Sequence, residues 1–283
     1  MLATLREVLG DARRGGYAVP GFDCVEDVLV RAIAETAAAR RSPVVLMCLP
    51  PDLEGNGMAY LPAAILAAAE CHDIPIVLHL DHATELDQIA RAVERGFSSV
   101  MIDGSALPLE ENIRLTCAAV EIARRRGASV EAELGHVGGS DLEATTLRES
   151  VLTEPAEVAE FVERTGVDAL AVSIGTAHGV YRSLPRLSIE RLRALSAVSP
   201  VPLVLHGGSG TPDDQIRESV RHGICKLNIY ADIRIAMGRG LREAAARQRR
   251  EDPLPGELFG PIRRAVAEVV ETKIDLLGSA GRA

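Results

Sequence analysis

Three histidines stand where short apolar runs end, and their residue type points to metal binding. His82 lies in HLDHA (79–83), His178 in SIGTAHGVY (173–181), and His206 begins the turn after LVL in LHGGSG (205–210). A lone histidine is more often structural than a ligand, but three of them beside Gly or Asp at separate strand ends favour a shared site. Imidazoles from rigid elements suit a tetrahedral zinc ion with one position open for substrate. The pattern predicts zinc or another divalent metal, with a monovalent cation as a further candidate.

Acidic residues accompany these histidines. Asp81 directly precedes His82, where a carboxylate transfers substrate protons or, alternatively, orients an imidazole. Glu131 and Glu133 in VEAEL share one face of a strand, because side chains repeat every two residues. Since buried carboxylates are costly unless paired, we expect a salt bridge at Glu131, with Glu133 closer to the barrel mouth. Asp103, which ends SVMID, is either a helix cap or a metal neighbour.

A glycine-rich turn, GGSGTPDDQI (207–216), runs into a predicted helix with Ser209 or Thr211 as its cap. Backbone N–H groups at such a helix start favour an anion, and the last two βα loops are the usual phosphate site of barrel enzymes. Asn228 follows on the next strand, in KLNIYAD. Because the only lysines are Lys226 and Lys273, a Schiff-base mechanism has two candidates.

Short β-branched runs alternating with amphipathic stretches supply the elements that would position these residues. Several runs are continuously apolar, as strands buried on both faces require, which favours a parallel sheet with helical crossovers. Since polar residues gather at the carboxyl ends of the strands, we predict a (β/α)8 TIM barrel, with a doubly wound open sheet as the alternative. Alternation predicts His79 and Asp81 on one face of their strand and Leu80 and His82 on the other, until the strand gives way to a loop, with His82 at the rim of the barrel. The predicted strands cover 17–22, 43–48, 75–80, 98–103, 128–134, 168–174, 201–206 and 223–229.

Length and composition fit one barrel domain over 1–283. The chain is 47% apolar and 25% charged, as in an ordinary globular protein, and its formal net charge of −9 argues against a nucleic-acid partner. Its five cysteines are scattered without a CxxC pair, which argues against a disulfide framework and a thiolate zinc site. With neither a signal-peptide core nor a membrane span in the sequence, we expect a cytoplasmic protein without a membrane partner.

Two segments interrupt the alternating pattern. The first, 135–154, is predicted to be a mobile loop over the mouth of the barrel. The second, 247–261, separates the last barrel helix from a C-terminal helix over roughly 262–276. That helix belongs to a C-terminal helical extension of about 250–283, which packs either on the barrel or on a neighbouring subunit. We expect a homodimer or a homotetramer.

Six ordered motifs together resemble the class II, metal-dependent fructose-bisphosphate aldolase family, including its tagatose-bisphosphate and related ketose-phosphate members. They are HLDHA, SVMIDGSALPLEENI, VEAELGHVGG, AVSIGTAHGVY, LVLHGGSG and CKLNI, and the likeness covers roughly 15–240. The resemblance implies a zinc-dependent reversible aldol reaction on a small-molecule ketose, with an aldehyde as the other reactant. It also implies site residues: His82, His178 and His206 as zinc ligands, Glu133 as a nearby metal contact, Asp81 as the residue that moves the proton, and Gly179, Gly207, Gly208, Ser209 and Asn228 around the ketone donor and its phosphate.

The chain departs from the family pattern at four places. Asp23 in GFDCVED replaces an Asn that contacts substrate, and Leu49 falls near an expected Ser. In the loop, GGSDLE offers Asp141 or Glu143 for the usual catalytic Glu, and Ala231 replaces a Thr of the phosphate pocket. A carboxylate near a phosphate costs Coulomb energy, so a differently substituted or non-phosphorylated donor is an alternative. Two further functions are alternatives: a non-catalytic zinc-binding partner subunit, and a Schiff-base aldolase that uses Lys226.

Overall fold

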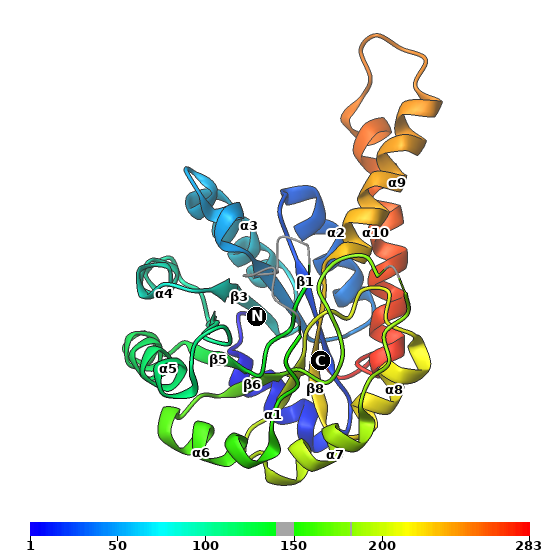
Figure 1. Ribbon diagram of the computed structural model, residues 1–283. Coiled ribbons are helices and arrows are strands. Elements are labelled where there is room, and N and C mark those ends of the chain that lie inside the picture. The colour runs from blue at the N-terminus through cyan, green and yellow to red at the C-terminus, as the bar shows by residue number, and fades with distance from the viewer. Residues whose placement is uncertain (140–149, 182) are drawn as a thin grey trace.

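A closed parallel barrel forms the centre of the molecule (Figure 1). The computed structural model describes residues 1–139, 150–181 and 183–283. Strand β1 pairs with β2 on one side and with β8 on the other, where Val19 lies opposite Lys226. This closure confirms the TIM barrel and excludes the open sheet. The strands are β1 Val19–Asp23, β2 Val44–Cys48, β3 Ile76–Ala83, β4 Ser99–Ile102, β5 Ser129–Leu134, β6 Ala169–Val172, β7 Leu203–Leu205 and β8 Ile224–Ile229.

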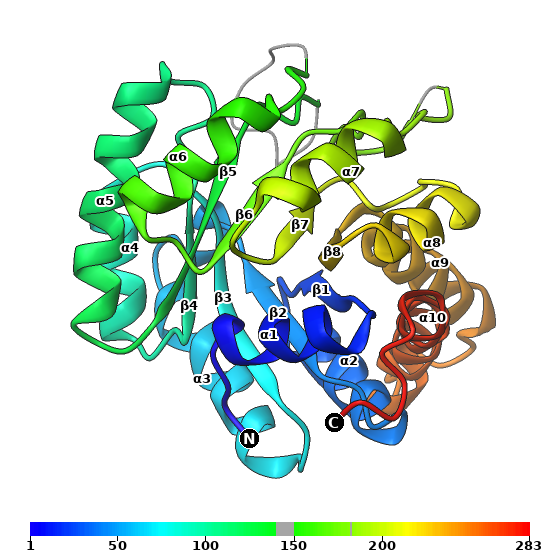
Figure 2. The same ribbon diagram turned by 90° about the horizontal axis from the view of Figure 1, so that it is seen from below.

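Helices surround the strands, and their apolar faces form the larger core of the protein (Figure 2). Every strand residue is buried, as expected for a parallel sheet covered by helices outside and side chains inside. The helices are α1 Leu5–Gly15, α2 Asp27–Ala39, α3 Gly57–Cys71, α4 Leu86–Glu94, α5 Leu109–Arg124, α6 Pro155–Thr165, α7 Ile189–Val198, α8 Asp213–Arg221, α9 Ala231–Arg247 and α10 Pro255–Leu277, with a short 3₁₀ turn at Pro50–Leu53.

Helix α1, which the sequence analysis did not identify, closes the amino-terminal end of the barrel. Thr4 caps it through a reciprocal capping box with Glu7, which satisfies amides that the first turn leaves free. Its buried Leu5 and Leu9 pack against interior side chains from the early part of several strands, including Val77. This end of the interior is therefore apolar, and the polar interior residues lie toward the carboxyl ends of the strands.

Strand β3 contains a bulge that the predicted alternation did not include. Its register with β4 shifts between Leu80 and Ala83, and His82 has a left-handed φ of 48°. A non-glycine residue in this region stores on the order of 1–3 kcal/mol of strain. Because of the bulge, His82 lies inside the barrel mouth beside Asp81, with Nε2 3.9 Å from Oδ2. The prediction that these two residues face opposite sides is therefore wrong.

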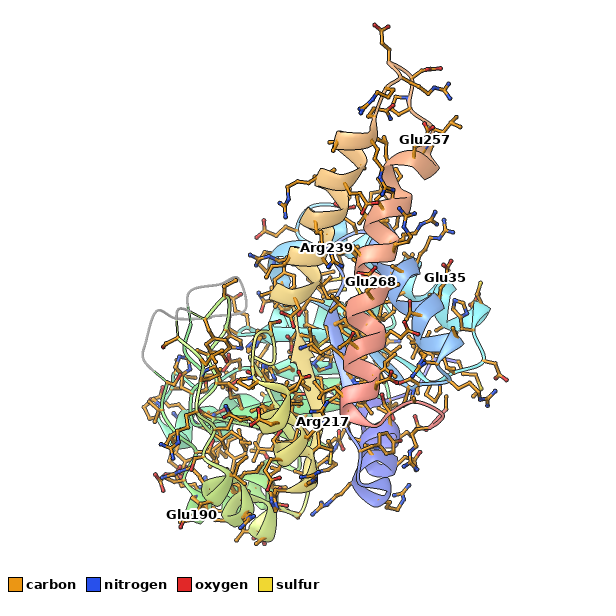
Figure 3. The ribbon with its side chains drawn as sticks, turned by 90° about the vertical axis from the view of Figure 1, so that its right-hand side faces the viewer. Glu35, Glu190, Arg217, Arg239, Glu257 and Glu268 are labelled. Carbon is orange, nitrogen blue, oxygen red and sulfur yellow. The ribbon has the colours of Figure 1, made fainter. Side chains whose placement is uncertain are left out.

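Helices α9 and α10 lie side by side and extend beyond the barrel, as Figures 1 and 3 show. Arg239 of α9 and Glu268 of α10 form an ion pair of 2.6 Å, and near the barrel Lys273 binds Asp232 at 2.8 Å. The predicted C-terminal helix is longer than expected, because α10 begins at Pro255, whose fixed φ suits the first helical turn. The extension packs on α9 and α2 of its own chain. In the part of the chain that is described, no helix is both long and apolar enough for a membrane span.

The ends of the predicted 135–154 loop are anchored. His136 and Val151 form an antiparallel bridge, and Gly139 pairs with His178. The Thr153 hydroxyl donates to the carbonyl of Leu134 at 2.5 Å. The predicted catalytic residues Asp141 and Glu143 lie outside the described residues.

Candidate active site

The three predicted metal ligands meet at the carboxyl ends of the strands. His82 comes from the bulge of β3, His178 from the loop after β6, and His206 directly follows β7. One ring nitrogen from each lies within 4.8 Å of the others. The closest pair is His82 Nε2 and His206 Nδ1, at 2.8 Å. Three buried imidazoles this close together could hold a metal ion.

Two of these imidazoles are oriented by carboxylates. Asp103 Oδ2 lies 3.0 Å from His82 Nδ1, and Glu131 Oε1 lies 2.8 Å from His206 Nε2. Each carboxylate leaves the other ring nitrogen of its histidine directed toward the cluster, the arrangement that fixes the tautomer of a metal-binding histidine. Asp103 does not cap helix α5, whose N-cap is Pro108, and its carboxylate contacts His82 instead.

The third imidazole, His178, has no hydrogen bond from either ring nitrogen among the described residues, although it is buried. Burial, followed by the neighbouring His82, holds its pKa well below the ordinary value. A neutral, buried imidazole with unused nitrogens is costly unless something binds it. A metal ion held by His82, His178 and His206 would satisfy it.

The surrounding carboxylates make the cluster suitable for a cation. Although burial lowers the pKa of His82, Asp81 and Asp103 outweigh it and raise that pKa to about 10. Burial and the charge of Asp103 raise the pKa of Glu133 to about 8. Glu133 Oε1 accepts the amide of Val137, and its other oxygen has no hydrogen-bond partner among the described residues. Negative charge thus exceeds what the local side chains neutralise, as a bound cation requires.

Asp81 is held beside the histidine cluster without orienting it. The amide of Asn228 donates to both of its carboxylate oxygens, at 3.2 and 3.0 Å. Burial would raise its pKa, but the positive charge of His82 and the imidazole of His79, whose Nε2 lies 3.5 Å from Oδ1, hold that pKa well below the ordinary value. Because its distance to His82 is too long for a hydrogen bond, the geometry favours the proton-transfer role over the orienting role. His79 lies one layer deeper, with Nδ1 2.8 Å from the hydroxyl of Ser99.

A buried ion pair lies directly beneath the histidines. Lys226 Nζ is 2.8 Å from Glu131 Oε2, and both side chains are fully buried. Burial opposes the charge of Glu131, but Lys226 and His206 lower its pKa to about 2. The sequence predicted the salt bridge of Glu131 but not its partner. A Cβ at Gly21 of β1 would lie 3.3 Å from Lys226 Cε, so the absence of a side chain there leaves room for the lysine.

The predicted donor-binding residues line the loops after β6, β7 and β8. Gly179 and Gly207 have left-handed φ of 94° and 68°, which favour glycine. Gly208 donates its amide to the carbonyl of Asn228 at 3.0 Å. These loops therefore adjoin Asp81 and His206, as the sequence predicts for a substrate pocket.

Ser209 and Thr211 do not cap the helix that follows them, so that prediction is wrong. Helix α8 begins after Pro212 without a side-chain cap. The Thr211 hydroxyl instead donates to the carbonyl of Gly207 at 3.1 Å. Ser209 Oγ accepts the amides of Tyr230 and Asp232, at 3.2 and 3.1 Å. The loop after β7 folds back over β8, and its serine hydroxyl caps the start of α9.

Three of the four departures from the family pattern fall on described residues, and these three are buried. Asp23 ends β1 on the interior side, Leu49 follows β2, and Ala231 is the first residue of α9. Burial, followed by the charges of Asp52 and Asp23, raises the pKa of Tyr230 above its ordinary value, so the charge of Asp23 reaches the start of α9. The altered positions thus lie around the same mouth as the histidines.

Comparison with known proteins gives one consistent set of relatives. The family model described as "Fructose-bisphosphate aldolase class-II" matches residues 3–282. A fructose-bisphosphate aldolase of Giardia intestinalis is 40% identical over 308 aligned positions, covering 100% of this chain and 94% of that protein. The crystal structure of the YdjI aldolase from Escherichia coli K12 is 34% identical with a TM-score of 0.89, and 100% of both chains is covered. The fructose-bisphosphate aldolase of Campylobacter jejuni shares the fold, with 23% identity, a TM-score of 0.85, and coverage of 100% of this chain and 97% of that one.

Proposed function

Because the chain belongs to the class II fructose-bisphosphate aldolase family, and is therefore an aldolase, we propose that it is zinc-dependent and reversibly cleaves a phosphorylated ketose. The products are an aldehyde and a ketone like dihydroxyacetone phosphate. The observation that carries this proposal is the meeting of His82, His178 and His206, with ligand nitrogens within 4.8 Å of one another. The family membership favours an enzyme over a non-catalytic partner subunit.

In this proposal each residue of the site has one task. His82, His178 and His206 hold the zinc ion, which supplies Lewis-acid polarisation of the ketone carbonyl when bound. Asp81 accepts or returns the proton of the aldehyde-derived hydroxyl, and its two hydrogen bonds from Asn228 keep it oriented for that transfer. The backbone of the loops at Gly179 and Gly207 surrounds the donor ketone.

The buried ion pair argues against the Schiff-base alternative. Lys226 Nζ is bound to Glu131, with no exposed surface on either side chain. A Schiff base requires the amine to reach the substrate carbonyl, but this nitrogen is enclosed in the barrel interior and held by a carboxylate at 2.8 Å. Borohydride in the presence of substrate is therefore expected to trap no covalent adduct on Lys226.

A donor without the usual phosphate is the second candidate, and Asp23 is the observation that favours it. The carboxylate is fully buried at the end of β1, where its charge opposes an approaching phosphate. Ala231 removes a hydroxyl from the same region. Kinetics with matched phosphorylated and unphosphorylated ketoses decide between the two donors through their relative kcat/KM.

The proposed function is tested by removing and restoring the metal. After dialysis against a chelator, the protein should lose retro-aldol cleavage of ketose bisphosphates, and one equivalent of zinc should restore it. Magnesium serves as the control ion, because its preference for octahedral oxygen ligands does not suit three imidazoles. Undiminished cleavage by protein that is shown to be metal-free would refute zinc dependence.

We also propose that the chain forms a homodimer or homotetramer through the arm of α9 and α10. Ile235, Leu241 and Phe259 on this arm are 55%, 57% and 46% exposed, and apolar side chains gain free energy when a partner covers them. Between 239 and 264, seven arginines outnumber four carboxylates in a chain of net charge −9, which favours an acidic second copy as partner. Light scattering should give a multimer for the parent and a smaller mass for Leu241→Glu with Phe259→Glu.

A further inference from the structure

One phenol joins the two loops that carry His178 and His206. The amide of Ala177, which precedes His178, donates to Tyr181 Oη at 2.9 Å. The same hydroxyl donates to the carbonyl of Gly207, which follows His206, at 2.9 Å. The backbones next to two proposed metal ligands are therefore connected through a single side-chain atom.

The two loops also pack directly against each other around this phenol. A Cβ at Gly207 would lie 2.5 Å from the carbonyl oxygen of Ala177, so the two backbones approach too closely for any side chain. The ring of Tyr181 lies against Gly210, where a Cβ would be 3.3 Å from its Cδ2. Both glycines have a left-handed φ, of 68° and 70°. The contact thus combines hydrogen bonds with close packing.

His178 depends on this contact more than the other two histidines do. Asp103 orients His82 and Glu131 orients His206, whereas neither ring nitrogen of His178 has a hydrogen bond among the described residues. The position of its ring therefore depends on its backbone and on an edge-to-face contact with His82, whose ring centroid lies 4.9 Å away. That backbone is held by the amide of His178 itself, which donates to the carbonyl of Gly138 at 2.8 Å, and by the Tyr181 bridge.

We propose that Tyr181 is a positioning residue that holds His178 at the distance from His206 at which both bind one metal ion. This inference rests on the proposed metal-dependent function. Without the hydroxyl, the loop after β6 keeps its bond to Gly138 and its packing on the loop after β7 but loses the two hydrogen bonds that join these loops. His178 then samples positions farther from His206, and the metal site is less preorganised.

The test compares Tyr181→Phe with Tyr60→Phe, since Tyr60 on α3 is 70% exposed and far from the site in sequence. Zinc affinity is measured by competition with a chromophoric chelator, and Tyr181→Phe should weaken it about tenfold, as removal of other residues that orient metal ligands does. In metal-free protein, hydrogen exchange at the amide of Ala177 should be faster in Tyr181→Phe than in the parent. The unfolding temperature of the metal-free variant should stay close to that of Tyr60→Phe.

Three results would overturn the role of Tyr181. They are zinc affinity equal to that of the parent, unchanged exchange at Ala177, and a loss of zinc affinity matched by general unfolding of the metal-free variant. A parent chain that binds no zinc at all would instead overturn the proposed metal site, and with it this inference. The parent measurement thus separates the two failures.

Discussion

Replacing Lys226 by methionine should destabilise the barrel at neutral pH and leave the metal ligands in place. Methionine fills a similar volume but removes the charge that neutralises Glu131 within the interior. The carboxylate then has His206 as its remaining hydrogen-bonded neighbour. Removing one partner of a buried pair typically costs about 3–5 kcal/mol, because the other charge is left uncompensated.

The pKa of Glu131 gives the same magnitude independently. Its value of about 2, against an ordinary 4.5, corresponds to on the order of 3 kcal/mol of stability at neutral pH. Because the folded-state pKa lies below the unfolded one, this stability is fully present above about pH 4.5 and is lost as the pH falls toward 2. The difference between parent and Lys226→Met should therefore be largest at pH 7 and shrink to on the order of 1 kcal/mol by pH 3.

Urea unfolding of metal-free protein, followed by circular dichroism between pH 7 and pH 3, measures this difference without a contribution from zinc binding. The double variant Lys226→Met with Glu131→Gln should recover part of the loss at pH 7, since replacing both charges of a buried pair is often close to neutral. A difference below about 1 kcal/mol at pH 7 would refute the reasoning. A difference in unfolding free energy between parent and variant that stays constant from pH 7 to pH 3 would also refute it.

Three further predictions concern the site. Asp81→Asn should retain zinc in a chelator competition but lower kcat by about 10²–10⁴-fold, because an amide cannot accept the proton; a variant with parental kcat contradicts the assigned role. Asp103→Asn should weaken zinc binding by about 10–100-fold, as loss of a carboxylate that orients a ligand does, and zinc titration by calorimetry checks this. Gly207→Ala should lose zinc and stability, because the added Cβ meets the backbone of Ala177. The control is Gly281→Ala, which has a similar φ of 71° but no atom within 4 Å of the added Cβ, so it should show only the backbone strain. Equal unfolding temperatures for the two variants would exclude the contact with Ala177.

The alternation of apolar strands with amphipathic helices was sufficient to predict the barrel and the convergence of its histidines. Parallel strands buried on both faces leave a distinct apolar signature, and polar residues at their carboxyl ends are conspicuous against it. Helix α1 was not predicted, although the Thr4-x-x-Glu7 capping box and the helical spacing of Leu5, Val8 and Leu9 are sequence signals of a helix. Its role in closing the barrel depends on contacts with interior residues such as Val77, which lie far away in sequence.

The kind of chemistry could be predicted from the sequence, because three imidazoles and an adjacent carboxylate stand at strand ends in the order of one enzyme family. How these groups are held depends on contacts that form only in the folded barrel. The bulge at His82, the pairing of Glu131 with Lys226, the capping of α9 by Ser209 and the bridge at Tyr181 all join residues from different elements or break a local pattern. A local pattern determines which face a side chain occupies, but its partner depends on register, bulges and loop packing, which only the closed barrel brings together.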